Sequence, residues 1–244
     1  MDKIKQLAKL IKDAKDIACL TGAGMSTESG IPDFRSPNGI YNTLSSEEIF
    51  DINKFNREPS GFFKINGPLY CSIIEAKPNA GHLALAELET KFHKNVSVAT
   101  QNIDGLHQKA GSTKVFEVHG TMHTLTCRKC GAQVVCNDYL AVFQKGETPR
   151  CKCGGIFKPD VTFYGENLPE QAFNDSIRAF RRCDLAIVLG TSLVVYPAAS
   201  LPSQRPYTSK LVIINRSETA MDDEADIVIN DSIGEVLPKA LELL

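Results

Sequence analysis

The chain has 244 residues, of which 27 are Lys or Arg and 29 are Asp or Glu. This near balance excludes a strong overall field for nucleic acid or an anionic membrane, and apolar runs such as residues 185–189 are far too short to span a bilayer. The length permits one large domain and a small second module. Acidic residues interrupt the N-terminal lysines, and no arginine precedes Arg35, so a signal or transit peptide is not indicated. We expect a soluble, cytoplasmic monomer that binds neither nucleic acid nor membrane directly.

Buried-strand patterns alternate with helical ones along the chain. Apolar residues recur at helical spacing over residues 4–14, and residues 17–20 then have the pattern of a buried strand. Further strands are expected at residues 96–100, 115–118, 185–189, 211–214 and 227–229, and helices from residue 45, at 81–91, at 169–181 and from 232 to the end. Capping boxes at Ser45 with Glu48 and at Ser232 with Glu235 would begin two of these helices. The pattern predicts an α/β fold with a Rossmann-like parallel sheet and helices on both faces.

Polar residues and glycines follow five of the predicted strands. In chain order these tips are Gly22-Ala23-Gly24, Gln101-Asn102-Ile103-Asp104, His119-Gly120, Gly190-Thr191-Ser192 and Asn215. Each tip alone has a purely structural explanation: a tight turn for the glycines, a helix cap for Thr191, a satisfied histidine for His119. Ligands of open parallel sheets bind outside the carboxyl ends of the strands. The joint placement of the tips therefore predicts a nucleotide site.

The segment after the first strand begins like a nucleotide-binding loop and then departs from that pattern. Glycines at positions 22 and 24 are expected to let backbone N–H groups approach a pyrophosphate. Pro32 disfavours a helical conformation for Ile31, so the chain is expected to form a loop where a dinucleotide fold would continue with a helix.

Five of the eight cysteines lie close together in the sequence, and four of them form two pairs. Cys127 and Cys130 are separated from Cys151 and Cys153 by 20 residues, a pattern that predicts a tetrahedral zinc site rather than disulfides. Four sulfur ligands leave no open position, so the metal would be structural and would hold a small module over residues 122–158. Cys136 is a spare. A zinc ribbon for nucleic acid is the competing interpretation, but the module has too few basic residues to favour it.

Several long motifs occur in the order found in one family. They are GAGMSTESGIPDFRS at 22–36, TQNIDGLH at 100–107, His119-Gly120, the paired cysteines, PDVTFYGE at 159–166, GTSLVVYP at 190–197 and Ile214-Asn215. In these motifs the chain resembles the sirtuins, the NAD-dependent protein lysine deacylases, over nearly its whole length. It is most similar to a compact bacterial or archaeal member. The resemblance implies a discontinuous NAD-binding domain, residues 1–121 and 159–244, interrupted by the zinc-binding module at 122–158.

The resemblance also implies which residues contact NAD. They are Ala23, Thr27, Phe34, Arg35, Gln101, Asn102, Ile103, Asp104, His119, Thr191, Ser192, Asn215 and Asp231. Among these, Asp104 would accept a hydrogen bond from the carboxamide of nicotinamide, and Asn215 would contact the adenosine ribose. Phe34 would shield the reaction centre.

By the same resemblance, His119 and Asn102 are the catalytic residues. Nicotinamide would leave as the acetyl-lysine carbonyl oxygen attacks the ribose, and His119 would act as general base for the ribose hydroxyls, which suits the pKa of imidazole. The products would be nicotinamide, free lysine and O-acetyl-ADP-ribose. The alternatives are a mono-ADP-ribosyltransferase and a non-catalytic NAD-binding regulator. The presence of both His119 and Asn102 favours the deacetylase.

The expected partner is an acetylated lysine in a protein or peptide. The resemblance implies that its backbone pairs between residues 163–167 and 193–196, with Thr162 and Tyr164 facing the acyl-lysine channel. Residues 59–72 lack the Tyr-x-x-Arg pair found in sirtuins that remove succinyl or malonyl groups, and Lys64 is the only cation there. We therefore expect acetyl-lysine to be preferred over succinyl-lysine.

Overall fold

The computed structural model describes residues 2–33 and 49–244, and its larger part is built on a six-stranded parallel sheet. The strand order is β3-β2-β1-β7-β8-β9. These strands are β1 (Asp16–Thr21), β2 (Asn95–Thr100), β3 (Val115–Glu117), β7 (Leu185–Leu189), β8 (Lys210–Ile214) and β9 (Ile227–Ile229). Every predicted strand is therefore confirmed, and so is the parallel sheet. Among the described residues, no helix combines the length and apolar character that crossing a bilayer requires.

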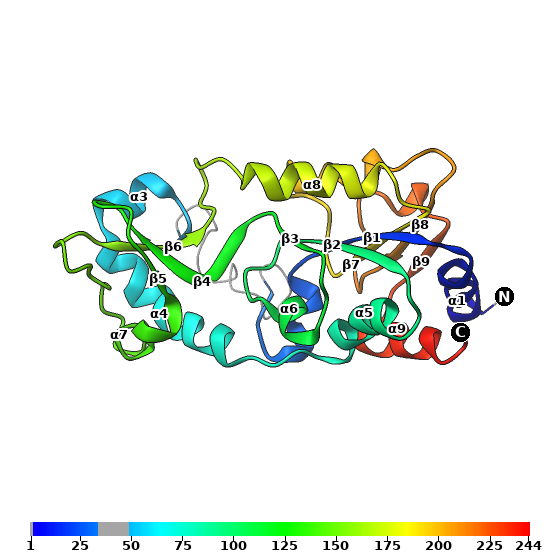
Figure 1. The fold of residues 1–244 in the computed structure, drawn as a ribbon, viewed down its shortest axis with the longest axis horizontal. Helices are drawn as coiled ribbons and strands as arrows, with labels where there is room; N and C mark the ends of the chain where they lie inside the picture. The colour runs from blue at the N-terminus through cyan, green and yellow to red at the C-terminus, as the bar shows by residue number, and fades with distance from the viewer. Residues whose placement is uncertain (1, 34–48) are drawn as a thin grey trace.

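Helices cover both faces of this sheet (Figure 1). One face packs against α1 (Lys3–Asp13), α5 (Ala80–Thr90) and α9 (Ile233–Leu241), and the other against α8 (Glu170–Phe180). The side chains of β1 alternate between them: Ile17 and Cys19 face the first set, and Ala18 and Leu20 the second. Two buried faces explain why these strands are apolar throughout, and why Cys19 behaves as a small buried hydrophobe.

One predicted capping box is wrong, and another was missed. At the start of α9 the Ser232 hydroxyl donates to Glu28 Oε1 at 2.6 Å, and Glu235 pairs with Lys239, so Ser232 and Glu235 do not cap this helix reciprocally. A reciprocal box does begin α5, between Asn79 and the ring of His82. The predicted box at Ser45 and Glu48 lies outside the described residues.

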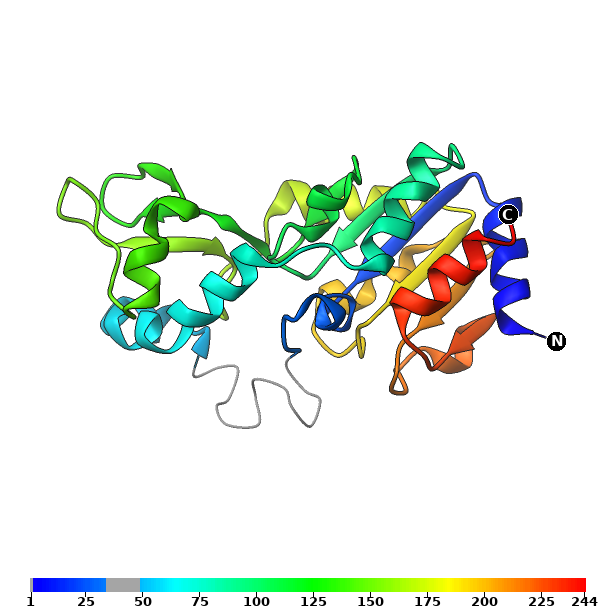
Figure 2. The same cartoon turned by 90° about the horizontal axis from the view of Figure 1, so that it is seen from below.

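A smaller module lies at the end of the molecule away from both termini (Figure 2). Its antiparallel sheet has the order β5-β4-β6, formed by β4 (Gly120–Cys127), β5 (Gln133–Val135) and β6 (Phe157–Val161). The helices α3 (Ile52–Arg57), α4 (Pro59–Glu75) and α7 (Leu140–Gln144) pack with it. The short α6 (Leu106–Ala110) follows the tip of β2.

The core of this module is aromatic and is shared with residues 49–75. Phe55, Phe62, Phe63 and Phe163 make edge or tilted ring contacts with centroids 5.0–5.9 Å apart. Gly67 in α4 lies against α7, where an added Cβ would be 2.3 Å from a backbone oxygen of Phe143. Helices from outside the predicted range 122–158 therefore complete the core of the module.

Candidate active site

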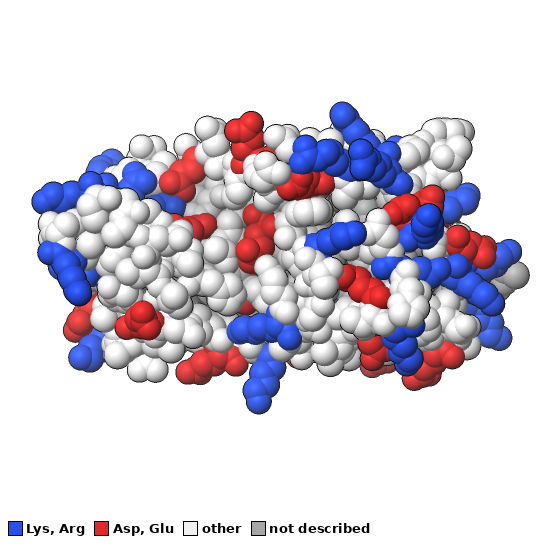
Figure 3. Space-filling view, viewed as in Figure 1, with Lys and Arg blue, Asp and Glu red and all other residues white. Residues whose placement is uncertain are grey.

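A cavity of about 1080 Å³ lies at the carboxyl ends of the parallel strands, where the two parts of the molecule meet. The residues of the predicted tips that line it are Gly22, Ala23, Gly24, Gln101, Asn102, Ile103, Asp104, His119, Gly190, Thr191, Ser192 and Asn215. The module contributes Thr162, Phe163 and Tyr164, and α4 contributes Leu69, Tyr70 and Ile73. On the face shown in Figure 3, several acidic side chains lie in the middle of the molecule, and others are scattered over the rest of the face. The strand tips thus line one cavity, as the topology of an open parallel sheet predicts.

The two loop glycines serve a close approach between loops. The N–H groups of Gly22 and Gly24 donate to the carbonyl oxygens of Leu189 and Gly190 at 3.0 and 2.9 Å. An added Cβ would lie 2.6 Å from Thr191 Cβ at position 22, and 2.9 Å from Gly190 Cα at position 24. Both of these amides are bonded within the protein, so the prediction that this loop brings backbone N–H groups to a pyrophosphate rests on its other amides.

Beyond the glycines the chain does not begin an α-helix. It forms two short 3-10 turns, η1 (Ala23–Met25) and η2 (Thr27–Ser29), and residues 31–33 are irregular. For the described residues, the predicted departure from the dinucleotide pattern is confirmed.

A hydrogen-bond network fixes Asn102 at the tip of β2. Its Nδ2 donates to Gly22 O and to Ser26 Oγ, both at 3.0 Å. The Ser26 hydroxyl donates in turn to Asp104 Oδ2 at 2.6 Å, while Asp104 Oδ1 accepts from the N–H of Leu106 at 2.9 Å. Both amide hydrogens of Asn102 are thus used, which leaves its Oδ1 as the side-chain acceptor for a ligand.

The ring of His119 is oriented by the neighbouring tip. Its Nδ1 lies 3.1 Å from the carbonyl oxygen of Gln101, which can only accept, so Nδ1 carries the proton and Nε2 is left with a free lone pair. Burial lowers the pKa of His119, so the imidazole is neutral near pH 7. Gln101 is itself held by a bond from Nε2 to Thr191 Oγ1 at 3.1 Å. The arrangement presents a neutral base to the cavity.

The four predicted metal ligands come together at the far end of the module. The Sγ atoms of Cys127, Cys130, Cys151 and Cys153 all lie within 4.8 Å of one another, with Cys127 and Cys153 3.5 Å apart and Cys130 and Cys151 3.8 Å apart. Tetrahedral zinc with bonds of about 2.3 Å requires sulfur atoms separated by about 3.8 Å, so these residues fit the ion.

The surroundings of Cys127 also favour a thiolate. The backbone N–H of Cys130 is the largest of the influences that lower the pKa of Cys127 to about 6. Gly155 leaves room for the sulfurs, because a Cβ there would be 2.6 Å from Cys127 Sγ. Cys136 is outside the group and is buried in the aromatic core.

Comparison with known proteins assigns the family. The model of the Sir2 family matches residues 22–197, which include the first loop, the tips of β2 and β3, and all four paired cysteines. The chain belongs to the Sir2 family. This membership confirms the resemblance deduced from the motifs.

Relatives of the Sir2 family align along the whole chain. An NAD-dependent protein deacetylase of Clostridium perfringens is 45% identical over 249 residues, 99% of each chain. A Sir2 protein solved with a p53 peptide and NAD+ is 39% identical, with a TM-score of 0.87 over 98% of this chain and 97% of that one. Another, solved with a propionylated peptide, is 38% identical, with a TM-score of 0.88 over 99% and 98%.

Some residues predicted from the Sir2 motifs do not line the cavity. The hydroxyl of Thr27 donates to Gly24 O at 3.1 Å and so stabilises the first loop. Asp231 is exposed and accepts from the N–H of Ser232 at 2.7 Å. Phe34 and Arg35 lie outside the described residues.

The sequence analysis missed Ser26 and a buried histidine pair. Ser26 lies inside the first Sir2 motif, and its position two residues after the second glycine was the available signal. The rings of His82 and His107 are 4.8 Å apart, and burial lowers their pKa values to about 4 and about 3. His107 Nε2 lies 3.0 Å from Thr21 Oγ1, which also bonds Thr100 Oγ1. Thr100 Oγ1 accepts in turn from the N–H of Asn102 at 3.1 Å, so the neutral ring of His107 belongs to the same network as Asn102.

Only part of the predicted peptide-binding segment 163–167 has free backbone groups. Tyr164 already pairs through its N–H with Phe50 O at 2.7 Å and through its carbonyl with Ile52 N at 3.1 Å. Gly165 has no backbone hydrogen bond to a described residue. Across the cavity, Val194 and Tyr196 are 53% and 72% exposed. In the two facing ranges, 165–167 and 194–196, the N–H of Glu166 donates to Phe163 O and Val195 O accepts from the N–H of Ala199, while the other backbone groups have no backbone hydrogen bond to a described residue.

Proposed function

We propose that this Sir2 chain is an NAD-dependent protein lysine deacetylase. It transfers the acetyl group of an acetylated lysine to ADP-ribose and releases nicotinamide and O-acetyl-ADP-ribose. The observation that carries the proposal is the neutral His119 ring, with Nε2 unprotonated, in the same cavity as the fixed Asn102. Relatives that align over the full chain and are named NAD-dependent protein deacetylases support it.

The strand tips hold NAD and prepare the proton transfer. NAD supplies the ribose carbon that receives the acyl oxygen and nicotinamide as the leaving group. Asn102 presents Oδ1 to the ribose, Asp104 accepts from the carboxamide, and Gln101 and Ile103 complete this side. His119 Nε2 takes a proton from a ribose hydroxyl, while its Nδ1–H stays bonded to Gln101 O.

Further residues are assigned to NAD by the same proposal. Thr191, Ser192 and Asn215 contact the phosphates or the adenosine ribose, and Ala23 offers the amide between the two bonded glycines. The other parts of NAD are proposed to contact Thr27, Phe34, Arg35 and Asp231.

The substrate is an acetylated lysine in a protein or peptide. Its backbone adds as a strand between residues 165–167 and 194–196, which places the acetyl-lysine beside Thr162 and Tyr164. Main-chain pairing of this kind depends little on flanking sequence.

We further propose a cytoplasmic monomer with two parts. Residues 1–121 and 159–244 form the NAD-binding domain, and residues 122–158 form the zinc-binding module, whose core is completed by helices of residues 49–75. Zinc has a structural role there, because four thiolates leave no open position.

The test is a product assay with the purified chain, NAD and an acetyl-lysine peptide. We expect mass spectrometry to detect deacetylated peptide, nicotinamide and O-acetyl-ADP-ribose in equal amounts. A mass gain of ADP-ribose on an acceptor protein, without deacetylation, would instead establish a transferase. Binding of NAD with no product of either kind would establish a non-catalytic regulator.

A further inference from the structure

Lys158 of β6 is a buried cation with every donor occupied. The residue is 6% exposed, and its Nζ donates to Pro159 O at 3.1 Å, to Val161 O at 2.7 Å and to Glu166 Oε2 at 2.9 Å. The same Nζ lies 4.0 Å from the centre of the Phe163 ring. Neither Lys158 nor its pairing has a part in the reaction described above.

Glu166 connects this cation to a turn at the edge of the cavity. Its Oε2 accepts from the N–H of Phe163 at 2.9 Å, and its own N–H donates to Phe163 O at 3.0 Å. Gly165 has a φ of 90°, which suits the third position of a tight turn. The turn 163–166 is therefore closed twice, once by the backbone and once by the carboxylate that Lys158 holds.

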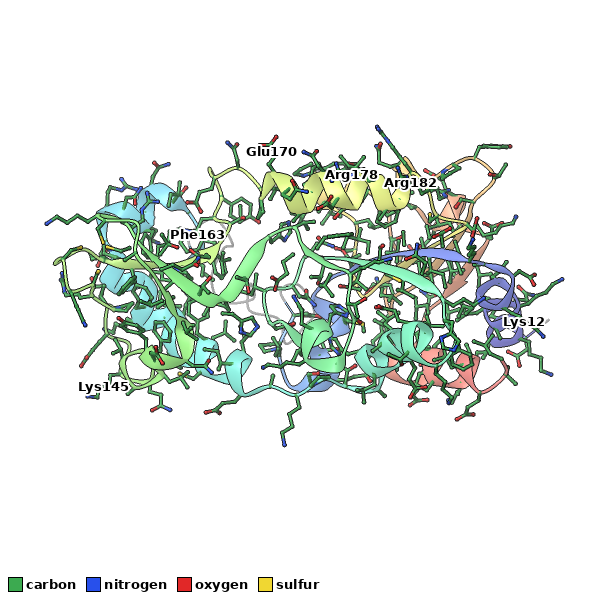
Figure 4. All side chains as sticks on the ribbon, viewed as in Figure 1. Lys12, Lys145, Phe163, Glu170, Arg178 and Arg182 are labelled. Atoms are coloured by element: carbon green, nitrogen blue, oxygen red, sulfur yellow. The ribbon has the colours of Figure 1, made fainter. Side chains whose placement is uncertain are left out.

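The other side of this turn is packed into the aromatic core. The ring of Phe163 is 1% exposed and contacts Phe50, Phe55 and Phe62, and Figure 4 shows it between β6 and α3. Lys158 thus links the core of the module to the edge 165–167, in which Gly165 has no backbone hydrogen bond to a described residue.

Stability alone is a poor explanation for such a pair. Removing two charges from water is costly, and apolar replacements of a buried ion pair are often equally stable or more stable. The geometry points to a different use, since both ends of the pair act on the backbone of one segment. Lys158 bonds two carbonyl oxygens before the turn, and Glu166 bonds the amide that begins it.

We propose that Lys158 and Glu166 are positioning residues for the acylated peptide. The pair holds the edge 165–167 in the register that a substrate strand needs, without touching NAD. This inference rests on the proposed function, because it assigns the edge to a peptide substrate. It also assigns a residue of β6, outside the cavity lining, to substrate affinity.

The experiment measures KM for an acetyl-lysine peptide, KM for NAD, and kcat for Lys158→Met, Glu166→Ala and the double variant. Each single variant frees the turn, so we expect KM for the peptide to rise about tenfold, the usual effect of losing a charge-assisted hydrogen bond. KM for NAD should stay within about twofold of the wild type. The double variant should resemble either single variant, because both remove the same pair.

The control is Lys239→Met, which removes an exposed pair of similar length with Glu235 on α9. It should leave all three constants unchanged. Glu166 is part-exposed, so Glu166→Ala tests the inference even where Lys158→Met fails to fold.

Three results would overturn the proposal: an unchanged KM for the peptide in Glu166→Ala, multiplied effects in the double variant, or a parallel rise in KM for NAD. A wild-type chain that does not deacetylate the peptide overturns the proposed function and this inference together. A wild-type chain that does so while the variants match it overturns the inference alone.

Discussion

The parallel-sheet part and the small module are stabilised in different ways. The six parallel strands bury two apolar faces under helices, and their polar residues stand at the ends. The three antiparallel strands of the module pack on one aromatic core, to which residues 49–75 contribute. Four paired cysteines lie at the far end of the module.

This difference determines how each part contributes to the cavity. On the sheet side, the backbone topology alone brings the tips together, and the hydrogen-bond network around Asn102 sets their orientation. On the module side, individual contacts carry the geometry: the metal ligands, the packing of Gly67 on α7, and the pair of Lys158 with Glu166. The effect of a substitution in the module should therefore be traceable to the loss of one particular contact more readily than the effect of a substitution in the sheet.

The largest expected effect is removal of one zinc ligand. Cys151→Ser should lose zinc and soluble protein together, because the metal supplies much of the folding free energy of so small a core. Elemental analysis of the purified protein measures this. Cys136→Ser is the matched control and should retain one zinc per chain, since Cys136 lies outside the sulfur group. Loss of zinc from that control would contradict the ligand assignment.

Acyl selectivity is the next largest effect. Among the described residues that line the cavity, none is Lys or Arg, and Lys64 is exposed and absent from the lining. A succinyl carboxylate would therefore be buried without a partner, which predicts kcat/KM about 10²-fold lower than for a matched acetyl peptide. Equal turnover of the two peptides would show that a cation reaches the acyl group.

A smaller effect concerns pH and the sheet side. His82 and His107 have folded-state pKa values of about 4 and about 3, below the ordinary value near 6.5. Their neutral forms stabilise the fold fully above pH 6.5, and this stability is lost as the pH falls toward the folded values. As the pH falls from 6.5 to 5, each of the two histidines should lower the free energy of unfolding by about 2 kcal/mol.

Urea unfolding at several pH values tests this expectation. His107→Gln should flatten the acid side of the profile, while His93→Gln, at an exposed position, should leave it unchanged. The same slope in His107→Gln and the wild type would contradict the assignment to the buried pair.

The sequence revealed most of the sheet and less of the module. Each parallel strand is a short apolar run followed by a polar tip, so pattern and topology together predicted both the fold and the members of the site. Contacts between distant segments were not predictable in this way. Ser232 bonds Glu28 across 204 residues instead of capping its helix, and α4 continues through Gly67 and Pro68 because it packs on α7. A lysine in β6 also gives no sign from sequence alone that it is buried.

The central claim is that His119 is the base that acts on NAD-bound substrate in this cavity. The most direct measurement is the single-turnover rate constant of deacetylation for the wild type and His119→Ala, with NAD affinity determined separately by calorimetry. We expect the rate constant to fall by about 10²-fold or more, because a general base is lost, while NAD affinity and unfolding temperature change little. An unchanged rate constant in His119→Ala, with NAD bound normally, would remove His119 from the reaction and contradict the account.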